Sequence, residues 1–177
     1  MKKLLCFILT GMILVGLCGC NGSVSVGKDA EEGSRDCAFS VQYIRTDGYV
    51  SGARFPRAVV IRSVEELEDY YNQNCETFSL GRRDKVYLDT TIGFLDACDK
   101  YTDAYFKDKL LVMVLVEYGS GSIRSEVTKV ELAEDGKLNV SIDSTSPELV
   151  TYDMAEWHIL IELENDIDIT AEDVVIN

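Results

Sequence analysis

A short segment of small polar residues is the first place in this 177-residue chain where the residue types suggest chemistry. It consists of Gly119, Ser120, Gly121 and Ser122, and Arg124 lies just beyond it. Small residues allow backbone N–H groups to converge on an anion, and an arginine adds positive charge beside them. The Lys-Ser/Thr ending of a phosphate-binding P-loop is missing, so the sequence does not indicate nucleotide binding. A wide turn between two strands is the simpler interpretation, and we keep this segment as the candidate binding loop.

Catalytic chemistry has few candidates in the sequence. His158 is the only histidine, and its apolar neighbours along the chain predict a structural residue on a sheet face. Ser120 and Ser122 lack the Gly-x-Ser-x-Gly setting of a nucleophilic serine and have no assigned base. We assign no catalytic residue and no cofactor. The alternative is a hydrolase that uses carboxylates or a serine near Gly119–Ser122.

Acidic residues gather near the C-terminal end of the sequence, at Glu162, Glu164, Asp166, Asp168, Glu172 and Asp173. Carboxylates this close together can bind calcium, but the segment lacks the central glycine and terminal glutamate of an EF-hand loop. Solvated surface charge is the simpler interpretation, so we predict no metal site.

The N-terminal segment predicts export from the cytoplasm. Met1–Lys3 is basic, and Leu4–Leu17 is an apolar stretch of 14 residues. A membrane-spanning helix needs about 20 residues, so this stretch is better interpreted as the core of a signal peptide.

The residues after this core resemble the bacterial lipobox. Leu17-Cys18-Gly19-Cys20 places Leu three residues before Cys20, and the resemblance implies cleavage after Gly19 with diacylglyceryl attachment to the Cys20 thiol. Acyl chains would then anchor the protein on the extracytoplasmic face of a bacterial membrane. An uncleaved anchor, an ordinary secretory signal and modification of Cys18 are the alternatives.

Composition predicts a flexible tether and an acidic domain in the mature chain. Asn21–Asp36 is rich in Gly and Ser and has little apolar bulk, which is typical of a tether. Without Lys2 and Lys3, 15 basic residues remain beside 31 acidic ones, a net charge of −16. This charge repels phosphate backbones, so we expect no nucleic-acid partner. The expected organisation is a signal peptide (1–19), lipidated cysteine and tether (20–36), and one domain (37–177).

Three cysteines remain in that domain: Cys37, Cys75 and Cys98. An odd number cannot pair fully within one chain, and no Cys-x-x-Cys motif is present. Export permits a disulfide between Cys75 and Cys98. Three buried free thiols are the favoured alternative.

Leu110–Val116 is the segment around which the domain is organised. Seven consecutive apolar residues between charged ends predict a central strand buried on both faces. Helices are predicted before it: one begins at a Ser63–Glu66 capping box, another spans about Thr91–Tyr101 and buries Ile92, and a short turn is capped by Asp103.

Alternating patterns predict the remaining strands, at Cys37–Ile44, Ala58–Ile61, Val127–Leu132, Leu138–Ile142, Trp157–Glu164 and Val174–Ile176. Asp135-Gly136 indicates a hairpin turn, and the Trp157–Glu164 pattern indicates a half-buried strand. The expected fold class is α+β, a mostly antiparallel sheet with two or three helices on one face.

Three segments, taken in order with the central strand, resemble the PrcB C-terminal-like domain family: Asp103–Phe106, Glu117–Ser122 and Asp153–Ile159. The family occurs in bacterial extracytoplasmic lipoproteins and takes its name from a subunit that accompanies a surface protease. The resemblance implies a non-enzymatic accessory or binding role. The expected partners are the membrane, through the lipid, and a protein such as a secreted protease or an envelope protein.

Overall fold

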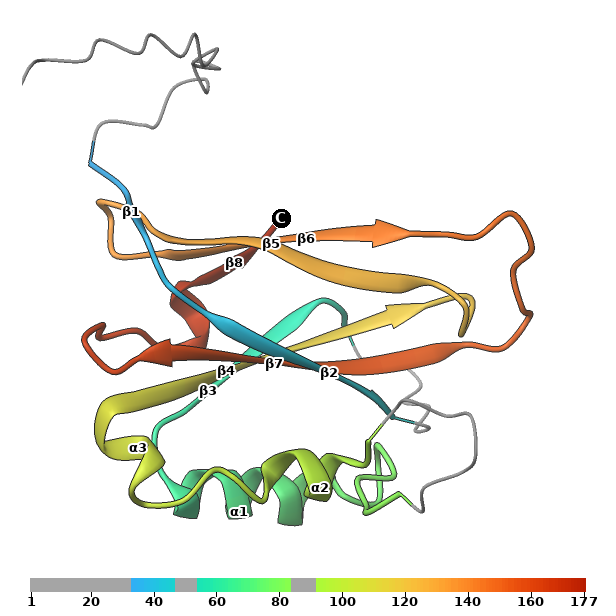
Figure 1. The fold of residues 1–177 in the computed structure, drawn as a ribbon, viewed down its shortest axis with the longest axis horizontal. Helices are drawn as coiled ribbons and strands as arrows, with labels where there is room; N and C mark the ends of the chain where they lie inside the picture. Colours follow the sequence, from blue (N-terminus) through green and yellow to red (C-terminus); the bar gives the residue numbers. More distant parts are fainter. Residues whose placement is uncertain (1–32, 47–53, 84–91) are drawn as a thin grey trace, which may run out of the picture. The chain divides into compact units, whose positions relative to one another are not determined.

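The computed structural model of the protein describes residues 33–46, 54–83 and 92–177 (Figure 1). The predicted signal peptide, Cys20 and most of the predicted tether lie outside these described residues. Within them the chain forms eight strands, three α-helices and one short 3-10 helix. None of these described helices combines the length and the apolar character needed to cross a membrane.

Four strands form a middle sheet in the order β2-β7-β4-β3, with all neighbours antiparallel. These strands are β2 (Ser40–Thr46), β3 (Arg57–Ile61), β4 (Lys109–Tyr118) and β7 (Ala155–Glu164). β4 contains the predicted central strand, and Leu110–Leu115 are at most 1% exposed. The prediction of a strand buried on both faces is therefore confirmed.

The other four strands form an outer sheet in the order β1-β5-β6-β8. They are β1 (Arg35–Asp36), β5 (Arg124–Leu132), β6 (Leu138–Thr145) and β8 (Val174–Ile176), and β8 runs parallel to β6. β5 and β6 form the predicted hairpin, whose Gly136 has a φ of +83°, a conformation that favours glycine. The sequence placed the later strands against β4, whereas among the described strands that follow β4 in the chain only β7 pairs with it. Arg35 and Asp36, assigned to the tether, pair with β5 and belong to the fold.

Figure 1 shows three layers: helices, middle sheet and outer sheet. One apolar core lies between the sheets and includes Val114, Val127, Val140 and Ile159. A second core lies between the middle sheet and the helices and includes Leu67, Phe94, Met113 and Leu160. β4 and β7 contribute to both cores, which explains their apolar composition. The α+β fold class, with mostly antiparallel strands and helices on one face, is confirmed.

The helices differ from the prediction in their details. In α1 (Val64–Asn74), Ser63 Oγ accepts the Glu66 N–H at 3.1 Å, but Glu66 accepts the N–H of Arg62 instead of Ser63. The second helix, α2 (Phe94–Cys98), is shorter than predicted because Gly93 is its N-cap. Ile92 therefore precedes the helix and is 40% exposed, while Phe94 is buried.

The last two corrections concern α3 and β7. α3 (Tyr105–Asp108) begins after Ala104, and Thr102 Oγ1 accepts the Tyr105 N–H at 3.4 Å in the role predicted for Asp103. β7 is buried on both faces, not half-buried, because it lies between β2 and β4 in the middle sheet. The outer sheet covers one of its faces and the helices cover the other. A 3-10 helix, η1 (Ala171–Asp173), leads into β8.

Candidate functional site

The candidate binding loop connects β4 to β5 and thereby links the two sheets. Gly119 and Arg124 are exposed, Ser122 is half-buried, and Ser120 and Gly121 are buried. Ser120 Oγ lies 2.8 Å from Ser122 Oγ and accepts the Ser122 N–H at 3.2 Å. These bonds close the loop on itself, so its shape is fixed by its own serines.

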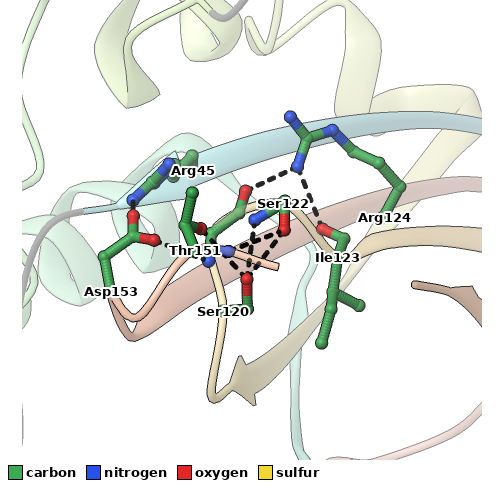
Figure 2. Close-up of polar contacts among 8 residues, drawn as sticks. Arg45, Ser120, Ser122, Ile123, Arg124, Thr151 and Asp153 are labelled. Atoms are coloured by element: carbon green, nitrogen blue, oxygen red, sulfur yellow. Dashed lines mark hydrogen bonds and ion pairs between the residues drawn. The ribbon is translucent and has the colours of Figure 1, made fainter. Parts of the chain in front are cut away.

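A second segment, just before β7, is bonded to this loop (Figure 2). Thr151 Oγ1 lies 3.0 Å from Ser120 Oγ, and the Thr151 N–H donates to Ser122 Oγ at 3.3 Å. Both serine hydroxyls are therefore engaged by neighbouring hydroxyl or N–H groups. No carboxylate or imidazole of the described residues is bonded to either hydroxyl, so the geometry gives them no base.

The loop does hold an anion, but the anion is a carboxylate of the same chain. Asp153 accepts the Gly121 N–H at 3.2 Å and pairs with the Arg45 guanidinium at 2.6 Å. The Thr151 hydroxyl, Arg45 and the Gly121 N–H together hold the pKa of the Asp153 carboxyl well below its usual range. A side chain at position 121 would displace the Asp153 carboxylate and the Arg45 guanidinium.

Arg124 is the cationic group of the loop, and it lies against aromatic and backbone groups. Its Nη1 donates to the carbonyl of Gly121 at 2.6 Å and to that of Ile123 at 3.0 Å. Its guanidinium carbon lies 5.4 Å from the centre of the Trp157 ring, a cation–π distance. Arg124 nevertheless remains exposed, so its charge is available to a partner.

His158 lies in the opposite core, where it is 1% exposed. Its Nε2 is 2.6 Å from the Tyr70 hydroxyl, and its Nδ1 is 3.3 Å from Thr46 Oγ1. Thr46 Oγ1 donates to the Glu156 carbonyl, so it accepts from Nδ1–H while Tyr70 donates to Nε2. The rings of Phe78 and Phe94 meet the imidazole edge-on. These contacts confirm the prediction of a structural histidine.

Acid should destabilise the fold through this residue. Burial, assisted by the positive charge of Arg57, lowers the pKa of His158 from 6.5 to about 3. Below pH 6.5 the unfolded chain therefore binds a proton at His158 that the folded chain does not bind. As the pH is lowered, the free energy of unfolding decreases by up to about 1.4 kcal/mol per pH unit. Above pH 6.5 His158 is neutral in both the folded and the unfolded chain, so it causes no such loss of stability.

Denaturant unfolding between about pH 7 and about pH 5, where most carboxylates stay ionised, measures this slope. His158→Gln keeps polar atoms for Tyr70 and Thr46 but cannot titrate, and we expect it to lose most of the slope. Equal slopes in the two proteins would mean that His158 titrates freely.

The structure does not bring the hydrolase candidates together. Ser120 and His158 have separate partners, and Asp153, the carboxylate beside the loop, is ion-paired and ionised at neutral pH. Surface hollows of about 460 Å³ beside the β5–β6 hairpin and about 260 Å³ between β4, β6 and β8 are lined by other residues.

The acidic C-terminal residues are dispersed among different partners. Glu162 pairs with Lys100, Glu164 with Lys109 and Asp166 with Arg35, while Asp173 accepts the Thr170 N–H. Among the residues that the structure describes, no three metal-ligating side chains come together. Cys37, Cys75 and Cys98 are half-buried free thiols, without the Cys75–Cys98 disulfide.

Arg45, Thr151 and Asp153 complete the site and are not among the site residues predicted from the sequence. Asp153 is 108 residues from Arg45 in the chain, and no local pattern links the two. Comparison of the chain with protein-family models, with curated proteins and with solved structures found no match.

Proposed function

We propose that the protein is a bacterial lipoprotein, anchored through Cys20, whose extracytoplasmic domain binds a protein partner without catalysing a reaction. The lipobox pattern Leu17-Cys18-Gly19-Cys20 behind a signal-peptide core is the observation that carries the proposal. The engaged hydroxyls of Ser120 and Ser122 support binding over catalysis. A secreted protease or an envelope protein is the partner class that the PrcB-like resemblance implies.

Cys20→Ser should abolish lipidation. The full-length chain is expressed in cells that are fed an alkyne-bearing fatty acid, and incorporated label is measured on the isolated protein. We expect label on the unchanged chain and on Cys18→Ser, and none on Cys20→Ser. Label retained by Cys20→Ser, but lost from Cys18→Ser, would move the anchor to Cys18 and contradict the assignment.

Arg124→Ala should weaken partner binding but leave the fold nearly intact. Arg124 is exposed and, among the described residues, makes only backbone and cation–π contacts, so its loss should cost less than about 1 kcal/mol of stability. Arginine is enriched among binding hot spots, so we expect partner recovery to fall about tenfold. A thermal melt and a pull-down of each variant separate the two effects. If the variant unfolds while recovery per folded molecule is unchanged, the loop has only a structural role.

A further inference from the structure

Apolar side chains are gathered on the connection between β6 and β7, which spans residues 146–154. Five large hydrophobic side chains are exposed in the described part of the chain, and four of them lie here: Leu149, Val150, Tyr152 and Met154. Leu149 is 88% exposed, and Tyr152 is fully exposed. Single exposed apolar residues are ordinary, but four within six positions of a strongly charged protein mark an interaction site.

The connection is held in place by the candidate binding loop. Thr151 bonds to Ser120 and Ser122, and Asp153 bonds to Gly121 and Arg45 (Figure 2). Thr151 and Asp153 thus bond to the loop, while Val150, Tyr152 and Met154 leave much of their side chains exposed. Because its backbone is already fixed, this segment loses little conformational entropy when a partner binds.

Acidic residues predominate in the part of the sequence that carries these apolar side chains. The fold brings Arg45, which pairs with Asp153, and Arg124 of the candidate binding loop close to this segment. No Lys or Arg follows Lys137 in the sequence, whereas ten Asp and Glu do. Near the end of the β5–β6 hairpin from which the connection departs, Glu126 lies directly opposite Asp143. Both carboxylates are exposed, and neither has an ion-pair partner among the residues the structure describes. Like charges directly opposite each other destabilise a sheet, and a cation supplied by a partner would relieve this repulsion.

We infer that Leu149, Tyr152 and Met154, together with Glu126 and Asp143, form a docking surface for a protein that presents an apolar groove edged by Lys or Arg. The inference rests on the proposed function and specifies the partner's chemistry. Tyr and Met are enriched in interface cores, and complementary charge at the rim directs association. A bilayer is the poorer occupant because anionic headgroups repel the carboxylates.

A photo-crosslinking side chain tests this surface in the full-length chain. p-Benzoyl-phenylalanine replaces Tyr152, or replaces Glu68 on the exposed side of α1 as a matched control. Cells are illuminated, and adducts are identified by mass spectrometry. We expect a protein adduct from position 152 but not from position 68, joined to an apolar segment that contains Lys or Arg. Leu149→Ser should lower its yield at least tenfold without changing the melting temperature, because Leu149 is exposed.

In isolated membranes, raising salt from about 0.1 to about 1 M shortens the Debye length from about 10 to about 3 Å and should reduce the yield severalfold. An adduct to phospholipid, to a second copy of this chain or to its own N-terminal segment would overturn the inference. The absence of any adduct would also overturn it, as would an adduct yield that changes neither with salt nor in Leu149→Ser. Fatty-acid label on Cys20 is measured in the same samples. Label without the adduct refutes the docking surface alone, whereas absence of label refutes the lipid anchor.

Discussion

Val114→Asp is expected to unfold the domain or lower its melting temperature by about 10 °C or more. Val114 is fully buried in the middle of β4, between Ala58 of β3 and Ile159 of β7, and it belongs to the core between the sheets. A carboxylate there has no partner and must either remain charged in an apolar layer or bind a proton. The cost is about 3 kcal/mol or more, and each kcal/mol lowers the melting temperature of a domain this size by a few degrees.

The matched control is Thr145→Asp, which adds the same charge at the exposed end of β6. We expect it to melt within about 2 °C of the unchanged protein, because exposed substitutions usually alter stability by less than about 0.5 kcal/mol. Thermal unfolding followed by circular dichroism measures both variants. If Val114→Asp melted as high as Thr145→Asp, β4 would have to be exposed, contrary to the three-layer fold.

Trp157→Ala should be the next most damaging change, at about 3–5 kcal/mol. Trp157 is 6% exposed in the core between the sheets, and it lies between Arg45 of β2 and Val116 of β4 in the ladder. Truncation would leave a cavity beneath Arg124 as well as remove the ring that the guanidinium covers. The measurement is the free energy of unfolding in denaturant.

Trp157→Phe provides the comparison that isolates packing. The indole N–H meets no hydrogen-bond partner among the described residues, so phenylalanine loses no hydrogen bond and retains most of the apolar contact. We expect it to cost well under half of the alanine value. A cost as large as that of Trp157→Ala would show that the indole nitrogen makes an essential contact.

Burial of a strand could be predicted from the sequence where apolar residues dominate. It was predicted less well where buried polar side chains bond to other side chains of the protein. The apolar run Leu110–Val116 predicts β4 correctly because a strand between two layers needs apolar residues on both faces. β7 appeared half-buried because His158 and Glu162 interrupt its pattern. In the fold, Tyr70 and Thr46 bond to His158, while Lys100 pairs with Glu162, so both polar groups lie inside.

Division into two sheets could not be predicted, because alternation in β5 and β6 shows that one face is buried but not what covers it. The candidate site has the same limitation. Composition identified Gly119–Arg124 as a loop, yet its anion ligand, Asp153, belongs to a segment more than 30 residues away. The exposure of the apolar side chains beside Asp153 could not be predicted either, because apolar residues in a sequence are equally compatible with burial.

The intact mass of the protein extracted from membranes with detergent tests the central proposal most directly. We expect a polypeptide that begins at Cys20 and carries two or three acyl chains, with the acidic domain of residues 33–177 attached through the predicted tether. A mass equal to the unmodified chain that begins at Met1, or to a cleaved chain without acyl groups, would contradict it.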